Sequence, residues 1–157
     1  MKEMITIQNG EFCMTFGPQF FPTVSQNVTR ILDMGLLCGQ DLSDDLLEWC
    51  ESREREHRDY VQACDQEQQE IFDELEDLRI QRTAARTALR DLKKQEGCTG
   101  EKTLRLKIEQ LSGAITDLRE KRTALTRERN RNGGVIRQIE RNRGRITEWQ
   151  QKWQRRS

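Results

Sequence analysis

The sequence predicts a mainly α fold: a long antiparallel two-helix coiled-coil hairpin behind a small N-terminal head of a β-hairpin plus a short helix. Three observations predict it: two long heptad repeats, a four-residue turn between them, and alternating apolar residues at the start of the chain. With 34% charged residues and only 2 prolines, the composition is typical of helices that bury a narrow stripe. The predicted domains are a head at 1–40 and a hairpin at 41–157, with arms 41–96 and 101–156.

The opening segment, ITIQNGEFCMTF, alternates in the manner of a half-buried β-hairpin. Asn9-Gly10 favours a type I′ turn, because both central residues of that turn need a positive φ. Such a loop places Ile7 opposite Phe12. It gathers the apolar side chains on one face: Ile5, Ile7, Phe12, Met14 and Phe16. A lone two-stranded ribbon is marginal in water, so we expect it to pack on other elements.

A short helix of about three turns should follow. Residues 23–26, TVSQ, match a capping box, and the next apolar residues recur at helical spacing. Gly35 and Gly39 mark its end. Asp41 and Ser43 can then cap the first long helix.

Two seven-residue repeats fill the remaining chain, with alternating steps of three and four residues as a and d positions require. The first consists of Leu47, Cys50, Glu54, His57, Val61, Cys64, Gln68, Ile71, Leu75, Leu78, Arg82, Ala85, Leu89 and Leu92. The second consists of Leu104, Ile108, Leu111, Ile115, Leu118, Arg122, Leu125, Arg129, Asn132, Ile136, Ile139, Arg143, Ile146, Gln150 and Trp153. The second repeat passes through Gly133-Gly134 in register, which favours one continuous helix; a flexible joint there is the alternative.

Residues 97–100, GCTG, predict the turn that makes the two helices antiparallel, with Gly97 as a C-cap and Thr99 as the next N-cap. Two registers of the helix pair are possible. The sequence numbers of two residues that face each other add up to about 200 in one register and to about 193 in the other. We expect the first, because it pairs Gln68 with Asn132, whose amides can bond. The second register pairs Gln68 with Leu125 and Cys64 with Arg129.

The formal net charge is zero, but the two arms carry opposite charges. Residues 41–96 hold 9 Lys and Arg against 17 Asp and Glu, and residues 101–157 hold 16 against 7. An acidic arm beside a basic arm favours pairing within one chain. Three arginines occupy seam positions of the second repeat, namely Arg122, Arg129 and Arg143. They can snorkel, pair with acids such as Glu54 or Asp73, or face a helix of another chain.

Most aromatic residues lie near the two ends of the chain, and an antiparallel hairpin would bring them together. We therefore expect the head to pack on the open end of the helical hairpin and to present a protein-binding surface. Its candidate residues are Phe12, Phe16, Phe20, Phe21, Trp149 and Trp153.

Catalytic, cofactor and metal sites are not expected. His57 is the only histidine and lies seven residues from both Cys50 and Cys64. Seven helical residues rise about 10.5 Å, whereas zinc ligands lie only about 2.0–2.3 Å from the metal. One ion therefore cannot hold all three. The chain also lacks the phosphate-loop, nucleophile-elbow and dinucleotide-binding patterns.

These features predict a non-enzymatic coiled-coil scaffold or adaptor for protein–protein assembly, with a homodimer as one possibility. The alternative is a nucleic-acid-binding protein that uses an arginine stripe on the second helix: Arg127, Arg131, Arg137, Arg141 and Arg145. Five scattered cysteines, which form no CxxC pair, favour reduced thiols and a cytoplasmic location. The absence of an apolar run of about 18 residues predicts no membrane span.

Overall fold

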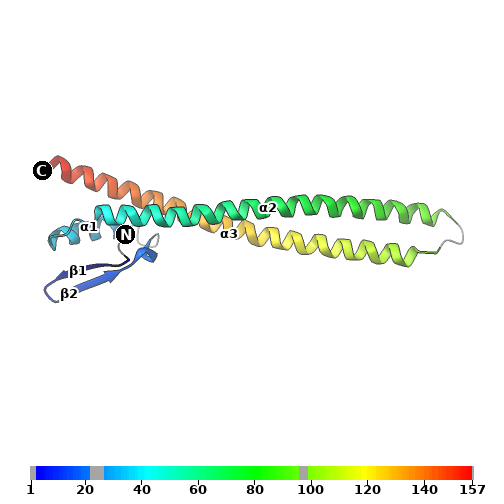
Figure 1. Cartoon of the computed structure of the whole chain (residues 1–157), viewed down its shortest axis with the longest axis horizontal. Helices are drawn as coiled ribbons and strands as arrows, with labels where there is room; N and C mark the ends of the chain where they lie inside the picture. The colour runs from blue at the N-terminus through cyan, green and yellow to red at the C-terminus, as the bar shows by residue number, and fades with distance from the viewer. Residues whose placement is uncertain (1–2, 22–26, 96–98, 157) are drawn as a thin grey trace. The chain divides into compact units, whose positions relative to one another are not determined.

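The computed structural model describes residues 3–21, 27–95 and 99–156 (Figure 1). Strands β1 (Ile5–Asn9) and β2 (Phe12–Phe16) are followed by the 3₁₀ turn η1 (Pro18–Phe20) and by helix α1 (Val28–Leu37). The long helices are α2 (Ser43–Lys93) and α3 (Glu101–Arg156). The predicted fold class is confirmed: the chain is mainly helical, with a small antiparallel β-hairpin and two long packed helices that form a helical hairpin.

The chain divides into two compact units. The terminal unit comprises residues 1–61 and 130–157, and the central unit comprises residues 62–129. Both α2 and α3 contribute to each unit. The described part of the chain contains no helix with the length and apolar character needed to cross a membrane.

The β-hairpin has the predicted faces but a different register. Ile5 pairs with Phe16, Ile7 with Met14 and Asn9 with Phe12, so the predicted pairing of Ile7 with Phe12 is wrong. The loop is Gly10-Glu11, and a positive φ (60°) at Gly10 but not at the next residue fits a type II′ turn, with glycine at its first central position. Because the slip is an even number of residues, every side chain keeps its predicted face.

α1 ends in a Schellman motif, in which the backbone N–H of Gln40 donates to Gly35 O at 2.7 Å and that of Gly39 donates to Leu36 O at 3.0 Å. Gly39 has a φ of 75°, which suits glycine at this position. Asp41 then caps α2, as predicted, by accepting the N–H of Ser43 at 3.0 Å. The cap predicted at Ser43 is wrong, because Ser43 is the first residue of the helix and its hydroxyl donates to Asp41.

The capping box predicted at 23–26 and the Gly97 cap both lie outside the described residues. The N-cap predicted at Thr99 is wrong, because α3 begins at Glu101 and Leu104 N–H donates to Gly100 O. The helix runs through Gly133-Gly134 without interruption.

The heptad seam is largely as predicted. Every predicted a and d position of α2 is buried or half-buried, and on α3 only Arg122 and Trp153 are exposed among the predicted positions. In the central unit the apolar part of the seam is built around Ile71, Leu75 and Ile115.

The expected register of the two helices is wrong. Gln68 donates to Thr126 Oγ1 at 2.8 Å, and Arg129 forms an ion pair with Asp65. These contacts belong to the register that sets Gln68 beside Leu125 and Cys64 beside Arg129. Asn132 bonds His57 at 2.6 Å instead of pairing with Gln68 as expected. The ion pairs explain the preference, because the seam arginine gains a carboxylate partner and Gln68 still finds a hydroxyl.

Candidate functional site

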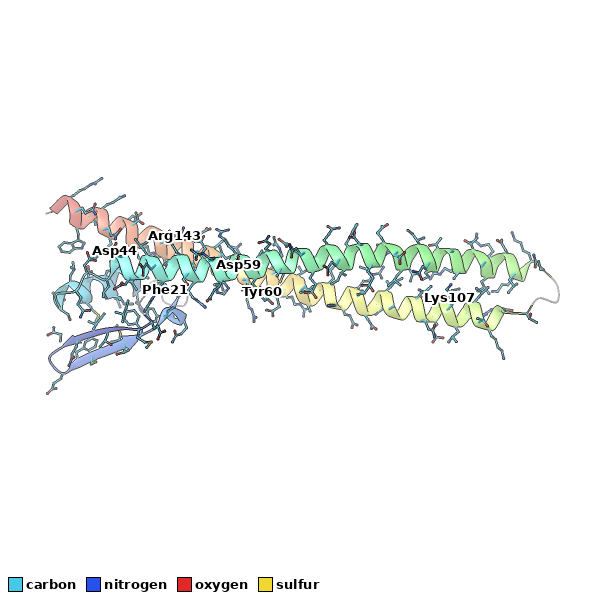
Figure 2. The ribbon with its side chains drawn as sticks, viewed as in Figure 1. Phe21, Asp44, Asp59, Tyr60, Lys107 and Arg143 are labelled. Carbon is cyan, nitrogen blue, oxygen red and sulfur yellow. The ribbon has the colours of Figure 1, made fainter. Side chains whose placement is uncertain are left out.

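The terminal unit has a dense aromatic core. Phe16 lies 5.1 Å from Phe20 and 5.8 Å from Trp49, measured between ring centroids, and Phe21 lies 6.3 Å from Trp49. Figure 2 labels Phe21 between the β-hairpin and α2. One buried cluster joins these rings to β1, α1, the first turns of α2 and the last turns of α3. The β-hairpin therefore has the packing platform that the sequence implied.

This core uses several of the residues predicted to bind a partner. Phe16, Phe21 and Trp149 are buried in it, and Phe20 is half-buried. Phe12 and Trp153 are different, because their side chains remain 47% and 41% exposed. Of the six predicted aromatics, these two offer the most surface to another molecule.

Other exposed apolar side chains accompany them. Met4 is 50% exposed and Leu37, the last residue of α1, is 80% exposed. Figure 1 shows the turn between β1 and β2, the helix α1 and the C-terminal end of α3 at the same end of the terminal unit. Phe12 borders that turn, Leu37 ends α1 and Trp153 lies in the last turn of α3. Other exposed apolar side chains lie along the long helices, namely Tyr60, Phe72, Ile80 and Leu106.

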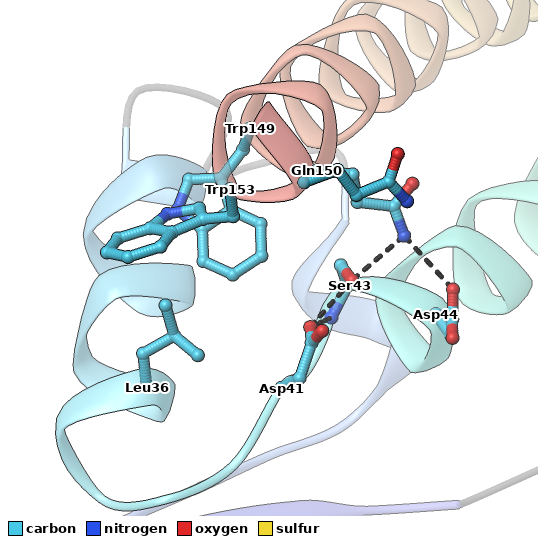
Figure 3. A pocket seen from close by; sticks show the side chains of 8 residues that line it. Leu36, Asp41, Ser43, Asp44, Trp149, Gln150 and Trp153 are labelled. Atoms are coloured by element: carbon cyan, nitrogen blue, oxygen red, sulfur yellow. Dashed lines mark hydrogen bonds between the residues drawn. The ribbon is translucent and has the colours of Figure 1, made fainter. Parts of the chain in front are cut away.

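A hollow of about 360 Å³ opens beside Trp153 (Figure 3). Leu36 of α1, Trp149 and Trp153 of α3 supply its apolar lining, and Asp41 and Asp44 supply carboxylates. The lining is fixed by several hydrogen bonds. Ser43 Oγ donates to Asp41 Oδ1 at 2.6 Å, and Gln150 Nε2 donates to Ser43 Oγ at 2.8 Å and to Asp44 Oδ1 at 3.0 Å.

A charged network joins α2 and α3 within the same unit. Glu54, only 7% exposed, accepts from Arg58 at 2.8 Å and pairs with Arg143, which Figure 2 labels on α3. Arg58 also bonds Glu140 at 2.7 Å. Of the alternatives open for the seam arginines, pairing with acids therefore applies to Arg143 and to Arg129.

Asn142 is a buried polar residue that the heptad pattern did not reveal. It is 0% exposed, and within the described structure neither its Nδ2 nor its Oδ1 has a hydrogen-bond partner. Asn142 and Trp149 widen the buried face of α3 beyond the seam, next to the seam residues Ile139 and Ile146. The same three- and four-residue spacing appears in the sequence and could have shown this wider face.

The arginines of the predicted stripe, Arg127, Arg131, Arg137, Arg141 and Arg145, are all exposed. Arg127 belongs to the central unit and the other four to the terminal unit. Arg137 and Arg141 lie one turn apart and line a shallow groove together with Glu140.

The described residues contain no group of three or more His, Cys, Asp or Glu side chains placed to hold a metal ion. Cys13, Cys38, Cys50 and Cys64 are free thiols, and the last two are buried. Burial raises the pKa of Cys50 to about 11, an effect that the charge of Arg143 partly opposes.

The fold therefore defines a class, a two-helix coiled-coil hairpin whose terminal unit also contains a β-hairpin and a short helix. No family model, curated protein or solved structure matches this chain.

Proposed function

We propose that this protein is a non-enzymatic, cytoplasmic coiled-coil scaffold or adaptor that binds partner proteins through the exposed aromatic surface of its terminal unit. The observation that carries the proposal is the exposure of Phe12 and Trp153 on a unit that buries most of its other aromatic rings. Exposed aromatic side chains are enriched at protein interfaces, where they supply much of the binding energy.

The helical pairing supports the proposal. The seam of α2 and α3 is closed by apolar contacts and by ion pairs such as Glu67 with Lys121, at 3.2 Å. These contacts pair the two long helices in the central unit, whereas Phe12 and Trp153 belong to the terminal unit.

The test is affinity purification of the full chain with Phe12 and Trp153 both changed to Gln. Phe72→Gln with Ile80→Gln is the matched control, since these central-unit side chains are 50% and 64% exposed. We expect partner proteins to be lost from the first variant and retained by the control, with circular dichroism unchanged in both. Equal retention by both variants would contradict the proposal.

A second copy of the chain is one partner that this surface could bind. Sedimentation equilibrium of the wild-type chain tests it directly. A dimer that Phe12→Gln with Trp153→Gln converts to monomer would identify the partner as the protein itself, whereas a dimer that this variant leaves intact would place self-association elsewhere.

A second candidate function is nucleic-acid binding, favoured by the exposed arginines at four-residue spacing, Arg137, Arg141 and Arg145. Binding through phosphates should weaken steeply as salt increases. Changing these three residues to Glu should abolish retention on heparin and on nucleic acid. The control is the same charge change at Arg86, Arg90 and Lys93 of α2, and unchanged retention of the first variant would exclude this function.

A further inference from the structure

We propose that the hollow beside Trp149 and Trp153 binds an arginine side chain of a partner protein. The inference rests on the proposed function and specifies the chemistry of one contact. It is carried by the juxtaposition of an exposed indole ring, an apolar wall and carboxylates around one opening (Figure 3).

The two tryptophans form a fixed aromatic wall. Trp149 is 5% exposed, and its indole N–H donates to Asp33 Oδ1 at 3.0 Å, which holds the ring in place. Trp153 packs against it with ring centroids 5.9 Å apart, yet 41% of Trp153 remains exposed. An exposed indole ring attracts a cation placed over its face more strongly than any other aromatic side chain does.

The side of the hollow formed by α1, the following loop and α2 is acidic, whereas the basic residues of the last α3 turns, Lys152 and Arg155, do not line it. Residues 31–52, which span most of α1, the connecting loop and the start of α2, contain six Asp and Glu and no Lys or Arg. Of these residues, Asp41 and Asp44 line the hollow and are exposed, and Asp33 bonds Trp149 of the wall. The positive end of the α2 dipole offsets only about half an elementary charge, so the hollow remains favourable to a cation.

The shape of the lining favours arginine over lysine. Leu36 and Trp153 give the hollow apolar surface on which a planar guanidinium and its methylene stem can lie. The N–H groups of the guanidinium point outward in its own plane and can reach the carboxylates at the same time. A lysine ammonium is more strongly hydrated and has no planar face to stack, so it gains less in such a site.

The experiment follows the three indole N–H resonances of the full-length ¹⁵N-labelled chain by NMR. The probe is the peptide Gly-Ser-Arg-Ser-Gly, compared with the same peptide carrying lysine or citrulline, a neutral analogue of arginine. We expect a saturable shift of Trp153 and a smaller one of Trp149. Trp49, which is 0% exposed in the same unit, is the internal reference and should not move. Citrulline should weaken binding about fivefold, and lysine should weaken it about twofold.

A variant carrying both Asp41→Asn and Asp44→Asn should weaken binding of the arginine peptide about threefold or more. The effect is modest because both carboxylates are exposed and solvent screens their charges. Asp59→Asn makes the same kind of charge change on α2 away from the hollow and should leave binding unchanged. The citrulline comparison requires no protein variant, so it holds even if a substitution disturbs the fold.

Equal binding of the arginine and citrulline peptides would overturn the inference. The absence of any Trp153 shift up to about 10 mM peptide would also overturn it. A Trp153 shift that depends on protein concentration without peptide would identify a second copy of the chain as the occupant. The proposed scaffold function survives each result if Phe12→Gln with Trp153→Gln still loses its partner, so the two failures are distinguishable.

Discussion

Trp149 donates its indole N–H to Asp33 at 3.0 Å, although 116 residues separate them in the sequence. The bond joins the last turns of α3 to α1. It requires the chain to reverse direction between α2 and α3, because α1 and the end of α3 could not otherwise meet within one molecule. The aromatic core and the acidic hollow both depend on that reversal.

The buried ion pair between Glu54 and Arg143 should matter more than an exposed pair. Arg143→Ala leaves a nearly buried carboxylate with one guanidinium partner fewer, and we expect a loss of roughly 1–3 kcal/mol, after allowing for the partial exposure of Arg143. Replacing both residues by Leu should recover most of this loss. Urea denaturation measures each value, and Lys121→Ala, which breaks an exposed pair, is the control, with an expected change below about 0.5 kcal/mol.

Asn142 should make the folded protein less stable than an apolar residue at the same position would. Its amide is fully buried and, among the described residues, has no hydrogen-bond partner. Asn142→Leu should therefore raise the free energy of unfolding by about 1–3 kcal/mol. Asn142→Asp would bury a charge and should destabilise the protein at neutral pH. Stabilisation by aspartate, or a loss with leucine, would mean that the amide is satisfied in solution.

Two glycine-to-alanine changes should have opposite signs. A Cβ at Gly35 would come within 2.9 Å of Gln40 O and of the Leu42 side chain, so Gly35→Ala should be destabilising. A Cβ at Gly113 meets nothing within 4 Å, so Gly113→Ala should stabilise α3 by about 1 kcal/mol. Thermal unfolding of both variants checks the prediction, and equal effects would show that Gly35 is not closely packed.

Cys50 should make stability depend on alkaline pH. Its pKa in the folded protein, about 11, lies above the ordinary value of 9.0, so its contribution is complete below pH 9 and is lost as pH rises toward 11. Cys50→Ala should remove up to about 2 kcal/mol of that decline. Denaturation of both proteins between pH 8 and pH 11 provides the measurement, and parallel curves would contradict a buried thiol.

Thiol labelling gives an independent check of the same burial. Exposed Cys13 should react with iodoacetamide within the native protein, whereas Cys50 and Cys64 should react only after unfolding. Peptide mass spectrometry distinguishes them.

The elements could be predicted from the sequence wherever periodicity was long, as in both heptad repeats and the strand faces. The register of the two strands and the register of the two long helices could not be predicted. Nothing local distinguished a type II′ turn at Gly10 from a type I′ turn at Asn9-Gly10, and both keep the same faces. The helix register depended on long-range ion pairs such as Asp65 with Arg129.

The candidate surface was predictable only in outline. Aromatic residues at both chain ends indicated a shared cluster, but not which rings would fill the core. That division depends on how the elements of the terminal unit pack together, with α1 bonded to α3 through Asp33 and Trp149. The hollow beside Trp153 combines residues from α1, the following loop, α2 and α3, and no short motif indicates such a combination.

The most direct test of the reversal is chemical cross-linking within one molecule. Gln150 Nε2 lies 3.0 Å from Oδ1 of the exposed Asp44, so cysteines at positions 44 and 150 should be joined by a short bis-maleimide. Cys13, Cys38 and Cys98 are first changed to Ser, the buried thiols are kept, and each single-cysteine variant is the control. We predict a cross-linked species with the mass of one chain at low protein concentration. Cross-links found only between two chains, or none at all, would contradict the account.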